Sequence, residues 1–449
     1  MSILGVLGRI ADIVLVSVLF LQIVLSIRVV RTLVQHIRHR REGMRREREM
    51  LAWPLPPDDE LPAVLVQIPT YNEGVLIRRV LDAVVALDWP RDRLAVQVLD
   101  DSTGASAELA RRAVAECQAD GHNVTLLQRA ERTGFKAGAL KLGLEATDQP
   151  FIAVFDADYI PPRDFLRQCM RPLLAQPDIA FAQARCDYLN AGQNWLTRAQ
   201  EIILDSHYAV EQPTRNWTGD FLPFNGTCGI WRREAIAAAG GWHGDTLTED
   251  LDLSYRAQLA GWRAVYLVSV GAPGELPDAF SIWNRQQLRW NKGYAQTARK
   301  LLPGIFVRRG LSWHDRFVAF LHLAGVTYGV LMVIGEGAAV IDFLLGTISW
   351  SIVIPLAAMG FFLGLAALIG MAFASRTLLG SIGVRRVTED LGPVLRVALV
   401  TSWMHSHAAA QTAFGVLQGL LGADASFLRT PKKGAGLDPK VESSPEVAE

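Results

Sequence analysis

Cysteine is scarce in this chain, and the few cysteines do not form a paired motif. The 449 residues include four of them, none in a CxxC arrangement: Cys117, Cys169, Cys186 and Cys228. A dense disulfide framework is therefore excluded, and a zinc site is not expected, because zinc sites are usually built from closely spaced cysteines. The four thiols fit a reducing, cytosolic setting.

An excess of charge of one sign is also missing. The chain has 45 Lys+Arg against 45 Asp+Glu, so its formal net charge is zero. Nucleic-acid-binding proteins usually carry a basic excess, and we therefore expect no nucleic-acid partner. Half of the residues are hydrophobic and the mean hydropathy is +0.19, which excludes disorder for most of the chain. These values are high for a soluble protein and low for one that lies wholly in a membrane.

Long apolar runs are present, and they lie near the two ends of the chain. The first covers residues 10–30, about the ~20 residues that span a bilayer, and arginines follow it rather than precede it. That order is the reverse of a cleaved signal peptide, and it predicts a retained anchor with the N-terminus outside and the next segment in the cytoplasm. A buried core helix followed by a solvated basic helix is the alternative. We predict three further spans over residues 317–343, 350–374 and 392–420.

The stretch from residue 61 to about residue 290 alternates short β-branched runs with segments of helical spacing. We predict its first strands over residues 64–68, 95–99, 124–127 and 151–155. Helical segments separate them, over residues 74–87, 105–118 and 136–146. This alternation predicts βαβ units and a mostly parallel sheet covered on both faces, with the ligand site beyond the carboxyl ends of the strands.

These patterns predict a soluble α/β domain between membrane-associated segments. The expected segments are an anchor (1–35), a basic juxtamembrane linker (36–60), the α/β domain (61–290), amphipathic interface helices (291–316), transmembrane helices (317–421) and a polar tail (422–449). Four spans would leave the tail outside, whereas its basic residues favour the cytoplasm. The number of spans and the side of the tail are therefore both open.

Acidic clusters follow two of the predicted strands, at residues 100–102 and 156–158. Neighbouring carboxylates at a strand end repel one another unless a cation or hydrogen-bond donors share the site. Asp156-x-Asp158 is therefore interpreted as a site for Mg²⁺ or Mn²⁺ and a diphosphate, with Asp158 as the direct ligand. For Asp100 and Asp101 the alternative is a helix cap and turn.

Three further segments combine residue types that bind anions or sugars. In residues 132–140, glycines and Lys136 precede a helix and would form an anion cradle, although a plain loop with a solvated lysine is equally consistent. Residues 246–253 resemble a helix start with acids in its first turn, after a flexible turn at 225–229. Residues 286–290 place an arginine beside a tryptophan, which suits phosphate and a sugar ring, or else an amphipathic helix with a surface tryptophan.

Together these motifs identify a family. Their order along the chain is residues 69–73 (PTYNE), 100–102 (DDS), the Lys136 loop, 156–158 (DAD), 225–227 (NGT), 248–250 (TED) and 286–290 (QQLRW). This set resembles the family 2 inverting glycosyltransferases, and within them the cellulose-synthase-like polysaccharide synthases. Residues 224–267 with 275–277 look most like the mannan and glucan branch, including its bacterial members. The resemblance implies a GT-A-type, Rossmann-like fold for the α/β domain.

The resemblance also implies a role for each site residue. The base and ribose of a nucleotide sugar would be held by Tyr71, Glu73, Asp100 and Asp101, and its diphosphate by Lys136. Mg²⁺ or Mn²⁺ would be bound by Asp156 and Asp158. The catalytic acids would be Asp250, as general base, and Glu249. The diphosphate and the acceptor sugar would be held by Gln286, Arg289 and Trp290.

The implied activity is transfer of a hexose from UDP-glucose or GDP-mannose to a growing β-linked polysaccharide. One displacement with a carboxylate as base inverts the anomeric centre, so no second nucleophile is needed. The expected location is the inner cell membrane, with the catalytic domain in the cytoplasm and a homo-oligomer or export partner completing a secretion path. Alternatives are a non-processive enzyme acting on a membrane lipid and, from Glu336 and Asp342 in apolar runs, a transporter. The sequence does not identify the sugar, the linkage or the acceptor.

Overall fold

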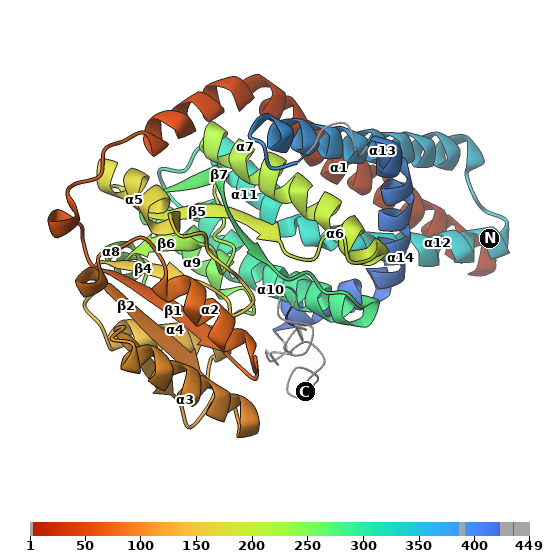
Figure 1. Cartoon of the computed structure of the whole chain (residues 1–449). Helices are drawn as coiled ribbons and strands as arrows, with labels where there is room; N and C mark the ends of the chain where they lie inside the picture. The colour runs from red at the N-terminus through yellow and green to blue at the C-terminus, as the bar shows by residue number, and fades with distance from the viewer. Residues whose placement is uncertain (1–2, 386–390, 423–433, 435–449) are drawn as a thin grey trace. The chain divides into compact units, whose positions relative to one another are not determined.

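The structure is a computed structural model that describes residues 3–385, 391–422 and 434 (Figure 1). The chain divides into two compact units. The helical unit comprises Met1–His39, Ile202–Thr214 and Gln286–Asp424, and the sheet unit comprises Arg40–Glu201, Arg215–Arg285 and Ala425–Glu449. Apart from residues 422 and 434, the predicted polar tail (422–449) lies outside the described residues.

The sheet unit contains a seven-stranded sheet with the strand order β3-β2-β1-β4-β6-β5-β7. The strands are β1 (Val64–Thr70), β2 (Leu94–Asp100), β3 (Val124–Gln128), β4 (Phe151–Val154), β5 (Ile179–Tyr188), β6 (Gly229–Arg232) and β7 (Arg263–Gly274). Strand β6 runs antiparallel to β4 and β5, and the other pairs are parallel. The predicted mostly parallel α/β sheet is confirmed, and its four predicted strands correspond to β1–β4.

Helices pack against strands in both halves of this sheet. They are α2 (Leu76–Val85), α3 (Gly104–Ala119), α4 (Phe135–Glu145), α5 (Phe165–Ala175), α8 (Arg233–Ala238) and α9 (Glu249–Leu259). Helices α3 and α4 contact β2, while α5 contacts β5 and β7, as Figure 1 shows. Strand β1 is buried along nearly its whole length, as expected for a parallel strand covered on both faces.

The remaining α- and π-helices belong to the helical unit and to the segments that join it to the sheet unit. These are α1 (Ile3–Leu51), α6 (Trp195–Ser206), the π-helix η3 (His207–Glu211), α7 (Gln212–Thr218), α10 (Phe280–Val307), α11 (Trp313–Leu323), α12 (Tyr328–Leu345), α13 (Trp350–Ser381) and α14 (Leu391–Leu421). Among the described residues, three helical stretches are long and apolar enough to cross a membrane: Ile3–Leu51, Trp313–Leu345 and Trp350–Ser381. The fourth predicted span coincides with α14, which is not among these three.

Acidic side chains within the apolar helices have local partners. The Asp12 carboxylate of α1 accepts hydrogen bonds from the backbone N–H of Ser349 at 2.9 Å and from the Ser349 hydroxyl at 2.5 Å, at the start of α13. Asp342 is fully buried and accepts a hydrogen bond from the Thr347 hydroxyl. These contacts satisfy polar groups in an apolar setting, so Asp342 has a structural explanation that needs no transport path.

Aromatic side chains fill the part of the core beside the antiparallel strand. Trp231 of β6 lies 4.4 Å from Phe181 of β5 and 5.3 Å from Phe224, measured between ring centroids, and all three are buried. Gly229 is the first residue of β6. A Cβ at this position would come within 2.7 Å of the Ala182 carbonyl oxygen and would overlap the Phe224 ring. A glycine is therefore required where β6 enters the sheet.

This close packing predicts that Gly229→Ala lowers the melting temperature of the protein in detergent. The expected loss of unfolding free energy is about 1–3 kcal/mol, the usual size of an overpacking defect. Gly192→Ala is the matched control, because a Cβ there meets no described atom within 4 Å. Equal melting temperatures for the two variants, measured by intrinsic fluorescence, would show that the packing at β6 is not tight.

Candidate active site

The register of the parallel strands determines where the polar residues meet. Thr70 at the end of β1 pairs with Asp100 at the end of β2, and Gln67 of β1 pairs with Val154 of β4. The segments that follow these strands therefore leave the sheet at the same edge. The predicted donor residues and both predicted metal ligands lie at or just after the ends of these strands, except Lys136, which lies in the first turn of α4.

The ends of β1 and β2 are connected by side-chain hydrogen bonds. Asn72 has a positive φ of 53°, its N–H donates to the Ser102 hydroxyl at 2.7 Å, and its side-chain oxygen accepts from the Thr103 N–H at 3.0 Å. Asp100 is buried and accepts from the Ser102 N–H at 3.0 Å and from the Gln128 side chain at 2.9 Å. The Asp100 carboxylate is thus engaged in shaping the turn.

Two arginines lie beside Asp101 and Tyr71. Arg129 donates from Nε at 2.8 Å and from Nη2 at 2.5 Å to the two oxygens of Asp101. The Arg132 Nε lies 3.6 Å from the same carboxylate, and its guanidinium carbon lies 3.3 Å from the centroid of the Tyr71 ring. Sequence reasoning missed Arg129, whose only signal was a basic residue at the end of β3, one position after Gln128.

Lys136, in the first turn of α4, bridges two other segments of the site. Its ammonium donates to Asp156 Oδ1 at 2.6 Å and to the Gly226 carbonyl at 2.9 Å. Burial by itself lowers the pKa of Lys136, but the neighbouring carboxylates Asp156, Glu249 and Asp250 outweigh it and leave the pKa raised. Lys136 is therefore a permanent cation at neutral pH.

Gly226 is the point at which the predicted cation and the predicted base come together. It has a φ of 76°, and a Cβ there would lie 2.9 Å from Asp250 Oδ2 and 3.4 Å from Lys136 Nζ. Asp250 occupies the first turn of α9, where the helix dipole favours a negative charge. The structure thus brings Lys136, Asp156 and Asp250 together around one glycine, with Glu249 next in sequence.

The two predicted metal ligands differ in their surroundings. Asp156 is 37% exposed at its side chain, and its N–H donates to the Thr227 hydroxyl at 3.0 Å. Asp158 is 8% exposed, and its Oδ2 accepts from the Glu275 N–H at 3.4 Å. Two carboxylates from one loop supply the oxygen donors that Mg²⁺ and Mn²⁺ prefer, so these residues fit such a cation.

A second cluster with metal-ligand chemistry is formed by the loop before α9 and by α9 itself, and it was not predicted. Ligand atoms of His243, Asp245 and Asp252 lie within 4.8 Å of one another. However, Arg256 donates from Nε at 2.8 Å to Asp252 and its Nη2 lies 2.8 Å from the same carboxylate oxygen. A guanidinium thus already neutralises Asp252, and the His243-x-Asp245 spacing was the only signal in the sequence.

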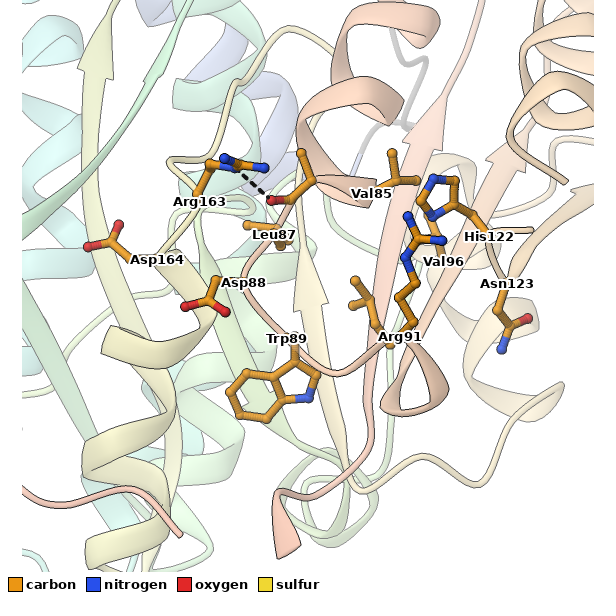
Figure 2. A pocket seen from close by; sticks show the side chains of 12 residues that line it. Val85, Leu87, Asp88, Trp89, Arg91, Val96, His122, Asn123, Arg163 and Asp164 are labelled. Carbon is orange, nitrogen blue, oxygen red and sulfur yellow. Dashed lines mark hydrogen bonds between the residues drawn. The ribbon is translucent and has the colours of Figure 1, made fainter. Parts of the chain in front are cut away.

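A pocket of about 680 Å³ lies away from all of these residues (Figure 2). It is lined by the start of β2, by His122 and Asn123 before β3, and by Arg163 and Asp164 before α5. The start of β2 and the residues before β3 are amino ends of strands, opposite the edge where the predicted site residues gather. Its mixture of basic and acidic side chains, visible in Figure 2, selects no class of ligand.

The last predicted motif lies in the helical unit. Gln286, Arg289 and Trp290 are on α10 at positions i, i+3 and i+4, so they share one face of that helix, and all three are partly buried. Their roles toward donor and acceptor remain predictions.

Comparisons with known proteins identify the family of the chain. The family model described as "Glycosyltransferase like family 2" matches residues 62–293. Over 265 residues the chain is 43% identical to glucomannan 4-beta-mannosyltransferase 1 of Oryza sativa subsp. japonica, covering 56% of this chain and 50% of that protein. It is also 43% identical over 263 residues to glucomannan 4-beta-mannosyltransferase 2 of Arabidopsis thaliana, covering 56% and 49%. The chain spans about half the length of these relatives.

A solved structure shows the same fold. The mannosyltransferase PcManGT from Pyrobaculum calidifontis, in complex with GDP-Man and Mn²⁺, aligns with a TM-score of 0.53 at 22% identity, covering 89% of this chain and all of that one. The GT-A fold expected from the resemblance is therefore confirmed. Because the family model matches more than half of the chain, the protein belongs to glycosyltransferase family 2.

Proposed function

We propose that this protein is an inverting, nucleotide-sugar-dependent hexosyltransferase that transfers mannose from GDP-mannose to a growing β-linked polysaccharide of the glucomannan type. The observation that carries the proposal is the meeting of Lys136, Asp156 and Asp250 around Gly226 at the carboxyl edge of the sheet. A cation, a metal-binding carboxylate and a base in one place are the parts that displacement of a nucleoside diphosphate requires. The named relatives support mannose as the sugar.

In this proposal the donor nucleotide binds along the ends of β1 and β2. The Tyr71 ring, covered on one side by Arg132, would provide a flat surface for the base, and Glu73 and Asp101 would hold the ribose. Because Arg129 and Asp101 form a bidentate pair, Asp101 also positions the loop before α4. Asp100 contributes indirectly, since its carboxylate holds the turn at Ser102.

The diphosphate lies between Lys136 and the Asp156–Asp158 loop. A bound Mg²⁺ or Mn²⁺ would be held by Asp156 and Asp158 and would neutralise charge on the leaving diphosphate. Lys136 adds a fixed positive charge beside Asp156, and its raised pKa keeps that charge through the neutral range. The Gly226 turn lets the backbone approach the diphosphate, because glycine has no side chain that would block Asp250.

Asp250 is the proposed general base. It accepts the proton of the attacking acceptor hydroxyl while the bond from the anomeric carbon to the diphosphate breaks. A single displacement inverts the anomeric carbon, so an α-linked donor yields a β-linked product. Glu249 lies beside the base in the same helical turn and raises the negative potential that keeps Lys136 charged.

The membrane setting completes the proposal. Three helical stretches with the composition of membrane spans support a protein of the inner cell membrane, with the predicted segments 1–35 and 317–421 as its membrane parts and 61–290 as a cytoplasmic catalytic domain. Gln286, Arg289 and Trp290 are proposed to hold the diphosphate and the acceptor sugar. A homo-oligomer or an export partner would carry the product across the membrane.

A donor screen on the purified protein tests the proposed reaction. With Mn²⁺, GDP-mannose is expected to give a β-linked polymer and UDP-glucose little product, since the similar proteins are named mannosyltransferases. Products are sized by chromatography and digested with β-mannanase. A product that extracts into chloroform would support the lipid-acceptor alternative instead, and transfer of a single sugar would refute processive synthesis.

Replacing the base tests the chemistry. Asp250→Asn is expected to leave GDP binding near normal and to reduce turnover by about 10²–10⁴-fold, the usual size of a general-base effect. Asp148→Asn serves as the control, because the Asp148 side chain is fully exposed and its ion pair with Arg233 is long, at 3.8 Å. Wild-type turnover in Asp250→Asn would remove the assignment.

Replacing the lysine tests the diphosphate contact. Lys136→Met is expected to weaken GDP binding by about 10–100-fold, because hydrogen bonds to charged groups contribute roughly 1.5–3 kcal/mol. The pKa of Lys136 is raised above its ordinary value. The ammonium therefore stays charged at every pH below this raised pKa and loses its charge only as the pH rises past it. The difference between wild type and variant, measured by calorimetry, should therefore stay constant from pH 7 to pH 9. A difference that vanishes within this window would contradict the contact.

A further inference from the structure

A buried ion pair lies next to Asp158. Arg79 of α2 donates from Nη2 to Glu275 Oε1 at 2.7 Å, and the two side chains are only 8% and 3% exposed. Glu275 directly follows β7, and Arg79 lies nearly 200 residues earlier in the chain. Neither Arg79 nor Glu275 is among the predicted site residues. Because charged groups are costly to bury, such a pair needs a structural or functional reason.

Both members of the pair also contact Asp158. The same Arg79 Nη2 donates to the Asp158 carbonyl oxygen at 3.2 Å, and the Glu275 N–H donates to Asp158 Oδ2 at 3.4 Å. The arginine thus holds the backbone of Asp158, and the backbone of Glu275 orients its carboxylate. The second Glu275 oxygen accepts from the N–H of Gly434 at 3.1 Å.

Neighbouring contacts extend this connection on either side of Asp158. The Ile160 N–H donates to the Pro273 carbonyl at 2.9 Å, so residues 158–160 run beside the end of β7. The Tyr159 ring lies against Gly274, where an added Cβ would come within 2.6 Å of its carbon atoms. The loop that carries Asp158 is therefore fixed to β7 by hydrogen bonds and by close packing.

The charge balance of the pair explains why it uses a carboxylate. Arg79 alone would place an unneutralised guanidinium next to a proposed cation ligand, where it would compete with the cation for the Asp158 carboxylate. Glu275 holds that guanidinium at 2.7 Å and leaves a pair of zero net charge. Arg79 can then donate to the Asp158 carbonyl without attracting its carboxylate.

We infer that Arg79 and Glu275 are positioning residues that orient Asp158 toward a divalent cation and keep the Arg79 charge away from it. This inference rests on the proposed function, since it deepens the metal site assigned to Asp156 and Asp158. Residues that orient a metal ligand in this way typically change metal affinity by about 10–100-fold when mutated.

The experiment measures the Mn²⁺ concentration that gives half-maximal enhancement of GDP binding, by calorimetry on the full chain in detergent. Glu275→Gln is expected to raise this concentration about 10–100-fold while GDP binding without metal stays at the wild-type value. The double variant Arg79→Gln/Glu275→Gln should recover part of the loss, because it removes the unneutralised guanidinium as well. Arg78→Ala is the control, since Arg78 is the neighbouring residue of α2 and its partners Asp82 and Glu116 are both exposed.

A purely structural role would give a different pattern. It would reduce GDP binding with and without Mn²⁺ alike, and the double variant would bind no better than the single one. That pattern, or a wild-type Mn²⁺ requirement in Glu275→Gln, overturns the inference. A lower melting temperature alone does not, because a buried charge left without its partner destabilises the fold in either case. Should Glu275→Gln not fold, Arg79→Lys provides the same test, because lysine keeps the charge but its shorter side chain does not reach the position of Nη2, the atom that contacts both acceptors.

The inference and the proposed function fail in different ways. A wild-type chain that binds GDP with Mn²⁺ but transfers no sugar refutes the proposed function and supports the metal site on which the inference stands. A chain that transfers mannose while Glu275→Gln and Arg79→Lys keep the wild-type Mn²⁺ requirement refutes the inference alone.

Discussion

Repulsion between carboxylates at one edge of a parallel sheet is the constraint on which the site depends. The register of β1, β2 and β4 delivers Asp100, Asp101, Asp156 and Asp158 to the same edge. Like charges so close together are stable only when cations or donors share the space. The structure meets this need with Arg129 on Asp101 and Lys136 on Asp156, and the carboxylate oxygens of Asp156 and Asp158 are of the kind that a divalent cation prefers.

Burial decides which of the many ion pairs matter for this arrangement. The exposed pair Arg111–Glu108 on α3 is of a kind that contributes about 0–1 kcal/mol. The Arg129–Asp101 and Arg79–Glu275 pairs are nearly buried, and removal of one partner from such a pair costs about 3–5 kcal/mol, since the other charge is left uncompensated. The loops around the site are therefore held by pairs that the chain cannot easily lose, which fits residues that must keep a fixed geometry during catalysis.

Local sequence patterns predicted the part of the structure that depends on neighbouring residues. The four β-branched runs became β1–β4, and polar residues at their ends came together, because parallel strands place their carboxyl ends at one edge. The antiparallel strand β6 was not predicted, since its four residues are too few to show a period. Arg129 and the Arg79–Glu275 pair were missed for another reason. Arg129 lies 28 residues from Asp101 in the sequence, and Arg79 lies 196 residues from Glu275, so no local pattern predicts either contact.

The central claim is that Lys136, Asp156, Asp158 and Asp250 form one donor site at the carboxyl edge of the sheet. An experimental structure of the protein with GDP and Mn²⁺, determined by cryo-electron microscopy, tests it most directly. We expect the cation on Asp156 and Asp158 and the diphosphate beside Lys136, with Asp250 facing the open side of the phosphate. Nucleotide bound elsewhere, for example in the pocket near His122 and Arg163, with no cation at Asp158, would contradict it.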